Sequence, residues 1–113
     1  MEQLRQWLEP ALDRGGNTHT FDDVMAEIEA EKMQLWTGPK GAAVTLIYDY
    51  PLKRVLHVFL AGGELEQVKD FVPSMEVWGR AMGCTEMTLA GRRGWSRVLD
   101  GWKPVLDVLA KEI

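Results

Sequence analysis

The most constraining feature of the sequence is a strand, helix, strand succession in its second half. Arg54 to Ala61 is rich in β-branched and aromatic residues, Glu64 to Met82 has apolar residues at helical spacing, and Thr85 to Ala90 has the pattern of another strand. A helical crossover between two strands places them parallel with a right-handed connection. Pro73 lies inside the helical segment and removes one backbone hydrogen bond, so we expect a kink or break near Phe71 to Pro73.

Two further extended segments precede this unit. Met33 to Thr37 is followed by the turn residues Gly38-Pro39-Lys40-Gly41, and Ala42 to Tyr50 is rich in strand-forming side chains. A second break at Tyr50-Pro51-Leu52-Lys53 leads into the Arg54 strand. Such short links favour antiparallel neighbours, so the three strands are expected to form a meander.

The N-terminal segment predicts two amphipathic helices. The first ends at Gly15-Gly16, and Thr20 can cap the second, with Asp22 and Asp23 near the positive end of its dipole. The apolar stripes are Leu4, Trp7, Leu8, Ala11 and Leu12 in the first helix, and Phe21, Val24, Met25 and Ile28 in the second. We therefore predict one α+β domain over residues 1–113, a three-layer arrangement in which a mixed sheet, an antiparallel meander plus one βαβ crossover, carries helices on both faces.

The sequence pattern does not decide the secondary structure of the C-terminal end. Trp95 to Asp100 predicts a short helix ended by Gly101. Lys103 to Ile113 fits either a last strand or a last helix, because Val105, Leu106, Val108 and Leu109 suit both periods.

Composition narrows the classes of function. Thirteen Lys and Arg against seventeen Asp and Glu give a net charge of -4, which argues against nucleic acid as a partner. Cys84 is the only cysteine, and His19 and His57 have no metal-ligand spacing, so we expect no disulfide and no metal site. The charged N-terminus and the lack of a long apolar run predict a soluble, cytoplasmic chain without a membrane segment.

The order of elements resembles the GNAT acetyltransferase fold, and the resemblance covers about Val44 to Ile113. Trp78 to Leu89 looks like the crossover helix of that family running into its next strand, and Gly101-Trp102-Lys103 looks like the segment after its last helix. Gly91 to Leu99 resembles the corresponding segment of small GNAT-like proteins encoded by bacteriophages and prophages. The phage resemblance implies a protein of the host cytoplasm or of the virion.

Two positions depart from the pattern of an active GNAT enzyme. Such enzymes hold the pyrophosphate of acetyl-CoA on loop amides after the equivalent of the Arg54 strand, but here Glu64 and Glu66 add negative charge at that point. Arg97 stands where the family usually has its general-acid tyrosine, and an arginine does not release a proton near neutral pH. We therefore expect a non-catalytic module with no cofactor, which acts through contacts with another protein or a second copy in virion assembly or structure.

The alternative is an N-acetyltransferase that transfers an acetyl group from acetyl-CoA to an amine by an atypical site. For this enzyme the resemblance implies that Ala61, Gly62 and Gly63 bind the cofactor. The strongest candidate anion site is formed by Arg92 and Arg93, with Arg97 nearby. We therefore expect Arg92 and Arg93 to bind the cofactor as well. His57 and Glu86 are the catalytic candidates, His57 because the ordinary pKa of histidine suits a general base. Sequence alone leaves open whether the chain is an enzyme.

Overall fold

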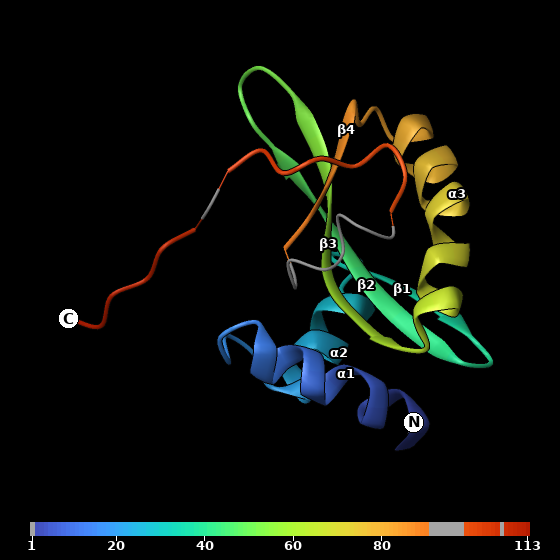
Figure 1. Ribbon diagram of the computed structural model, residues 1–113, viewed down its shortest axis with the longest axis vertical. Helices are drawn as coiled ribbons and strands as arrows, with labels where there is room; N and C mark the ends of the chain where they lie inside the picture. The colour runs from blue at the N-terminus through green and yellow to red at the C-terminus, as the bar shows by residue number, and fades with distance from the viewer. Residues whose placement is uncertain (1, 91–98, 107) are drawn as a thin grey trace.

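The computed structural model describes residues 2–90, 99–106 and 108–113. It contains the predicted succession of two helices, three strands, one helix and one strand (Figure 1). The elements are α1 (Glu2–Arg14), α2 (Phe21–Glu29), β1 (Gln34–Gly38), β2 (Gly41–Asp49), β3 (Arg54–Gly63), α3 (Leu65–Ala81) and β4 (Glu86–Leu89).

The four strands form one mixed sheet in the order β1-β2-β3-β4. β1 pairs with β2 and β2 with β3 in antiparallel fashion, whereas β3 and β4 are parallel and are joined by α3. Both the antiparallel meander and the parallel crossover predicted from the sequence are therefore confirmed. The fold class, an α+β mixed sheet with helices on both faces, is confirmed as well.

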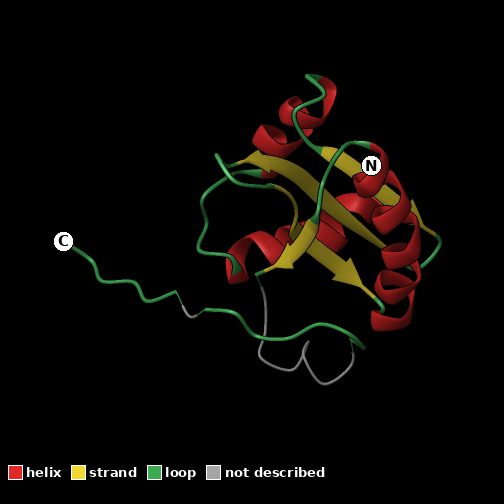
Figure 2. Ribbon diagram, turned by 90° about the horizontal axis from the view of Figure 1, so that it is seen from above, coloured by secondary structure: helices red, strands yellow, loops and turns green. Residues whose placement is uncertain are grey.

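Strand alternation divides the core between the two faces of the sheet. Ala42, Val44 and Leu60 pack in one cluster with the apolar stripes of α1 and α2. Ala43, Leu56 and Val58 belong to a second cluster, which contains Phe71 and Met75 of α3. Neighbouring strand residues point to opposite faces, so β2 and β3 supply both clusters. Figure 2 shows the strands between helical segments.

The N-terminal helices follow the predicted pattern. In α1 the buried residues are Leu4, Leu8, Ala11 and Leu12. Thr20 caps α2 as expected, because Asp23 N donates to Thr20 Oγ1 at 3.1 Å and Thr20 N donates to Asp23 Oδ2 at 2.9 Å. These hydrogen bonds hold the pKa of Asp23 below its ordinary value, and the bond from the Thr20 backbone has the largest effect.

The break expected near Phe71 to Pro73 does not occur. α3 is a single helix from Leu65 to Ala81 with Pro73 inside it. Phe71 and Met75 are buried on either side of the proline, in the cluster shared with β3. Burial of these large side chains stabilises the helical path against the loss of one backbone hydrogen bond.

The expectation of a last strand or helix over Lys103 to Ile113 is wrong for the residues that the structure describes. Residues 103–106 and 108–113 are in neither state, and residues 108–113 extend away from the body of the protein in both ribbon views (Figures 1 and 2). A segment of this length gains too little from its own hydrogen bonds to offset its chain entropy without a packing surface. Trp95 to Val98 of the expected short helix lie outside the described residues, and Leu99 to Gly101 form a bend and turn.

Candidate functional site

β4 pairs with only the first part of β3. Their pairing ends at Val58 and Leu89, but β3 continues to Gly63. The last five residues of β3 therefore have no partner in β4, and the sheet is open on that side among the described residues.

A β-bulge lies in β3 directly after Val58, the last residue that pairs with β4. Val44 pairs with Leu60 and Thr45 with Val58, so Phe59 is the extra residue in β3. The Phe59 ring meets the ring of His19 edge-on, with centroids 5.1 Å apart. A bulge bends its strand and redirects side chains, and bulges are over-represented next to functional sites.

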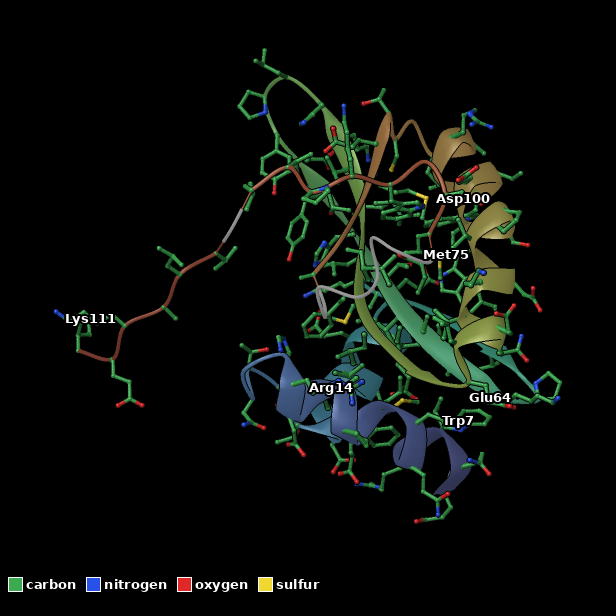
Figure 3. The ribbon with its side chains drawn as sticks, in the orientation of Figure 1. Trp7, Arg14, Glu64, Met75, Asp100 and Lys111 are labelled. Atoms are coloured by element: carbon green, nitrogen blue, oxygen red, sulfur yellow. The ribbon has the colours of Figure 1, made fainter. Side chains whose placement is uncertain are left out.

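The glycines at the end of β3 are tightly packed. A Cβ atom on Gly62 would lie 2.7 Å from the carbonyl carbon of Trp7 in α1 and would overlap its oxygen. Gly63 has a φ of +99°, and a Cβ there would overlap Gly41 and the carbonyl oxygen of Lys40. Ala61 packs against the cluster on the α3 side of the sheet. Figure 3 shows Trp7 and Glu64 near one another at this end of the sheet.

The first turn of α3 is bonded to the turn between β1 and β2. Glu64 N donates to the carbonyl oxygen of Lys40 at 2.9 Å, and Lys40 N donates to Gln67 Oε1 at 3.2 Å. Glu64 is the N-cap residue of α3 but makes no side-chain capping hydrogen bond, and Glu66 adds a second carboxylate in the first turn. Two acids therefore lie at the helix end where the backbone amides would otherwise attract an anion.

His57 and Glu86 lie on the same face of the paired strands, because Val55 pairs with Glu86 and His57 with Thr88. His57 Nδ1 is 2.7 Å from Thr88 Oγ1, and burial lowers the pKa of His57. Glu86 Oε1 instead accepts a hydrogen bond from Lys53 Nζ at 2.9 Å. The pair therefore offers an imidazole within hydrogen-bond distance of a hydroxyl, beside a carboxylate already bonded to a lysine.

Several candidate residues cannot be placed relative to this site. Arg92, Arg93 and Arg97 lie outside the described residues. Within the described part of the chain, no group of three His, Cys, Asp or Glu side chains could hold a metal ion. In the same residues, no helix combines the length and the apolar character needed to cross a membrane.

Sequence reasoning missed two features of this region. The bulge at Phe59 lies in an unbroken apolar run with no glycine or other local signal, so periodicity could not find it.

Arg54 joins two elements, since its Nη1 donates to the carbonyl oxygen of Met82 at 2.9 Å. Its Nε lies 3.1 Å from Asp49 Oδ1, an ion-pair distance without the geometry of a hydrogen bond. An arginine at the start of a strand gives no sequence signal for these contacts.

The structure is similar to several solved structures, among them two acetyltransferases. A point mutant of TTHA1254 from Thermus thermophilus superposes with a TM-score of 0.64 at 16% identity, covering 94% of this chain and 89% of that one. A GNAT family acetyltransferase from Staphylococcus aureus gives 0.63 at 13% identity, with 99% and 90% covered. Glucosamine-6-phosphate N-acetyltransferase from Arabidopsis thaliana gives 0.59 at 12%, with 92% and 90% covered.

These likenesses define the fold of the chain as GNAT-like. They extend over nearly all of this chain and of each neighbour, so the first two helices, which the sequence matched only by their order, are included in the shared fold. No protein-family model and no curated protein matches the sequence. Sequence identity of 16% or less is compatible with different functions on one scaffold, so function must be argued from the site itself.

Proposed function

We propose that this chain is a GNAT-fold protein that does not use acetyl-CoA and acts through contacts with other proteins. The observation that carries the proposal is the packing of Gly62 and Gly63. The space that a side chain would occupy at Gly62 is filled by the Trp7 backbone, and that at Gly63 by the turn between β1 and β2. Both glycines are therefore required by internal packing, with no need for a diphosphate to approach them.

Charge at the same junction supports the proposal. A pyrophosphate seated at the start of α3 would lie near the carboxylates of Glu64 and Glu66. The backbone N–H of Glu64 is already donated to Lys40. Repulsion between like charges and the loss of one amide donor both oppose an anion there, so the residues present do not fit the pyrophosphate cradle of the family.

The sequence suggests in which biological setting these protein contacts are made. The resemblance of Gly91 to Leu99 to phage-encoded proteins supports placing these contacts in the assembly or structure of a virus particle, within a host cytoplasm. The tail beyond residue 102 supplies exposed apolar side chains for such contacts. Aliphatic surface of this kind is usual where one protein docks on another.

The test is a thermal-denaturation series with acetyl-CoA. A ligand at about 100 times its dissociation constant stabilises a protein by about 2.7 kcal/mol, which is about 11 °C in Tm for a domain of this size. We expect no shift at millimolar acetyl-CoA, while a known acetyl-CoA-dependent enzyme in the same experiment shifts. A concentration-dependent rise in Tm would overturn the proposal.

A matched variant tests why this junction should not bind acetyl-CoA. Glu64→Gln with Glu66→Gln removes both carboxylates from the first turn of α3 and leaves the packing of Gly62 and Gly63 unchanged. If the amide of Glu64 that is already bonded to Lys40 is the larger obstacle, the double variant also shows no shift with acetyl-CoA. Binding by the double variant alone would assign the obstacle to charge.

The second candidate is an N-acetyltransferase with an atypical site. The end of β4 pairing at Val58 and Leu89, followed by the bulge at Phe59, favours it, because an extended ligand could lie against the part of β3 that β4 does not pair. His57, with its lowered pKa, would be the proton acceptor for the amine. Release of free coenzyme A in the presence of amines, lost in His57→Gln with an unchanged Tm, would favour the enzyme over the contact module.

A further inference from the structure

A cavity lies at one edge of the sheet, between the start of β1, the second half of β2 and the last turn of α3. Its volume is about 440 Å³, which is within the range of sites that bind small molecules. Its apolar walls are Ile28, Met33, Ile47, Trp78 and Met82. Glu31, Lys32 and Met82 are exposed, so the cavity opens to solvent at their side.

The cavity exists because β1 is shorter than β2. β1 begins at Gln34, which pairs with Thr45, so the last four residues of β2 have no partner in β1. The chain turns away before Gln34, since the N–H groups of Lys32 and Met33 are both donated to the carbonyl oxygen of Glu27, at 2.9 and 3.2 Å. The space beside the second half of β2 is therefore left for side chains to line.

A relay of hydrogen bonds fixes the polar group at the start of β1. Trp36 Nε1 donates to Thr45 Oγ1 at 3.0 Å, and Thr45 Oγ1 donates to Gln34 Oε1 at 2.9 Å. An indole N–H can only donate, so the Thr45 hydroxyl accepts from it and gives its single proton to Gln34. The Gln34 atom that receives this proton must be the amide oxygen, which settles the orientation of the side chain.

The relay leaves the Gln34 amide nitrogen available to a ligand. Thr45 is fully buried, so no water competes for its hydroxyl and the relay is held in place. Gln34 lines the cavity, and within the described residues its Nε2 makes no hydrogen bond. The cavity therefore has an oriented pair of N–H donors beside its apolar walls.

The other polar groups of the lining also favour an acceptor. Lys32 takes part in none of the ion pairs among the described residues, and Arg54 supplies a second cation, which Asp49 partly neutralises. Glu31 is the one carboxylate in the described lining. Donors thus exceed acceptors around the cavity, and a ligand that brings acceptor oxygens is the better match.

We propose that this cavity binds a small carboxylate with an apolar body. The carboxylate accepts hydrogen bonds from Gln34 Nε2 and from Lys32 Nζ, and bonds of this kind to an ionised group are stronger than neutral ones. The apolar body packs against Ile47 and Trp78, and the Trp78 ring is itself held edge-on to Trp36 with centroids 6.1 Å apart.

The inference goes beyond the proposed function and does not depend on it. The cavity adjoins the last turn of α3, whereas the junction that fails to fit acetyl-CoA adjoins the first. A helix of 17 residues spans about 25 Å, so the two regions are distinct. Absence of acetyl-CoA binding is therefore compatible with occupation of the cavity by another molecule.

The experiment is a titration of the full chain with phenylpropionate, followed by two-dimensional proton–nitrogen NMR. We expect saturable shifts of the Gln34 side-chain amide and the Trp78 indole N–H, with a dissociation constant of about 1 mM or lower for a ligand of this size. Phenylpropionamide has the same body without the charge and should bind about 10-fold more weakly. Phenylpropylamine presents a cation to the donors and should not bind in the cavity.

Two variants test the polar contacts. Gln34→Glu keeps an oxygen for the Thr45 hydroxyl but replaces the N–H donors by a negative oxygen, so it should weaken phenylpropionate binding at least about 10-fold. Gln6→Glu makes the same change at an exposed position of α1 outside the cavity and should leave binding unchanged. If Gln34→Glu lowers Tm too far to be studied, Lys32→Gln at the exposed mouth removes the other donor and should weaken binding to a similar degree.

Three outcomes would each overturn the inference. They are no saturable shift of the Gln34 and Trp78 signals up to about 10 mM phenylpropionate, amine binding as tight as that of the acid, and an unchanged affinity in the folded cavity variant. The peptide N-acetylglycyl-phenylalanine carries the same ring and carboxylate at a chain end. Tighter binding of this peptide than of phenylpropionate would identify a protein C-terminus as the source of the carboxylate, and weaker binding a free acid.

Discussion

Replacement of Gly62 by alanine should destabilise the protein in the absence of any ligand. The new methyl group would lie 2.7 Å from the Trp7 carbonyl carbon, and Cβ contacts under 3.0 Å are essentially never observed. The opposing atoms belong to the backbone of α1, so rotation of a side chain cannot relieve the overlap. Either α1 or the end of β3 must move, and Leu4 and Leu8 of α1 are buried in the cluster shared with β2 and β3.

The magnitude follows from the cost of overpacking. Inserting a methyl group into a closely packed site costs about 1–3 kcal/mol, and a contact with backbone places Gly62→Ala near about 3 kcal/mol. With an unfolding entropy of about 2.1 cal/mol/K for each of the 113 residues, this corresponds to a fall in Tm of about 13 °C. Differential scanning calorimetry without ligand measures it directly.

The control is Gly16→Ala. Gly16 has a φ of +94°, but no atom lies within 4 Å of the place that the new methyl group would occupy, so the variant carries backbone strain without overlap. We expect it to cost about 1 kcal/mol, or about 4 °C. A Gly62→Ala protein with a Tm no lower than that of Gly16→Ala would refute the packing argument and restore Gly62 as a position reserved for a ligand.

Two further predictions concern the helix cap and the buried histidine. Thr20→Ala removes the capping box of α2 and should lower Tm by about 4 °C, equivalent to about 1 kcal/mol. The control is Thr18→Ala, because the Thr18 hydroxyl contacts only His19 among the described hydrogen bonds, and this variant should leave Tm nearly unchanged. Equal effects of the two variants would contradict the role of Thr20 as a cap. Burial lowers the pKa of His57 in the folded state, so the unfolded chain takes up a proton first as the pH falls through about 6.5, and folding stability should decrease from there towards the lower folded pKa. Urea unfolding between about pH 5 and 7.5 should show a smaller decrease for His57→Gln than for the wild type, and parallel curves would show that another group is responsible.

Local patterns predicted much of this structure. The stripe of α1, the cap at Thr20 and the turn between β1 and β2 depend on residues close together in the chain, and all three are observed. The parallel crossover was also predictable, because a helix between two strands leaves few possible connections. The strand ends were predicted less accurately, and β3 runs two residues beyond the predicted end at Ala61.

The candidate site was predictable in part. The glycine pair at 62 and 63 stands out in the sequence by its position before a helix, but its close contacts are with Trp7 and with the β1–β2 turn, which are distant in sequence. Alternation along the strands places His57 and Glu86 on one face, whereas nothing in the sequence indicates Lys53 as the partner of Glu86. The bulge at Phe59 had no signal, because it arises from the register between β2 and β3.

The sequence alone determined which segments from Glu2 to Leu89 are helices and strands and how consecutive ones connect, since periodicity and turn chemistry act over a few residues. Only the tertiary structure decided where the pairing of β3 with β4 ends, what fills the space beside the glycine pair, and that Val108 and Leu109 near the C-terminus are exposed. These properties depend on contacts between backbone segments far apart in the chain, and no local pattern of side chains specifies them.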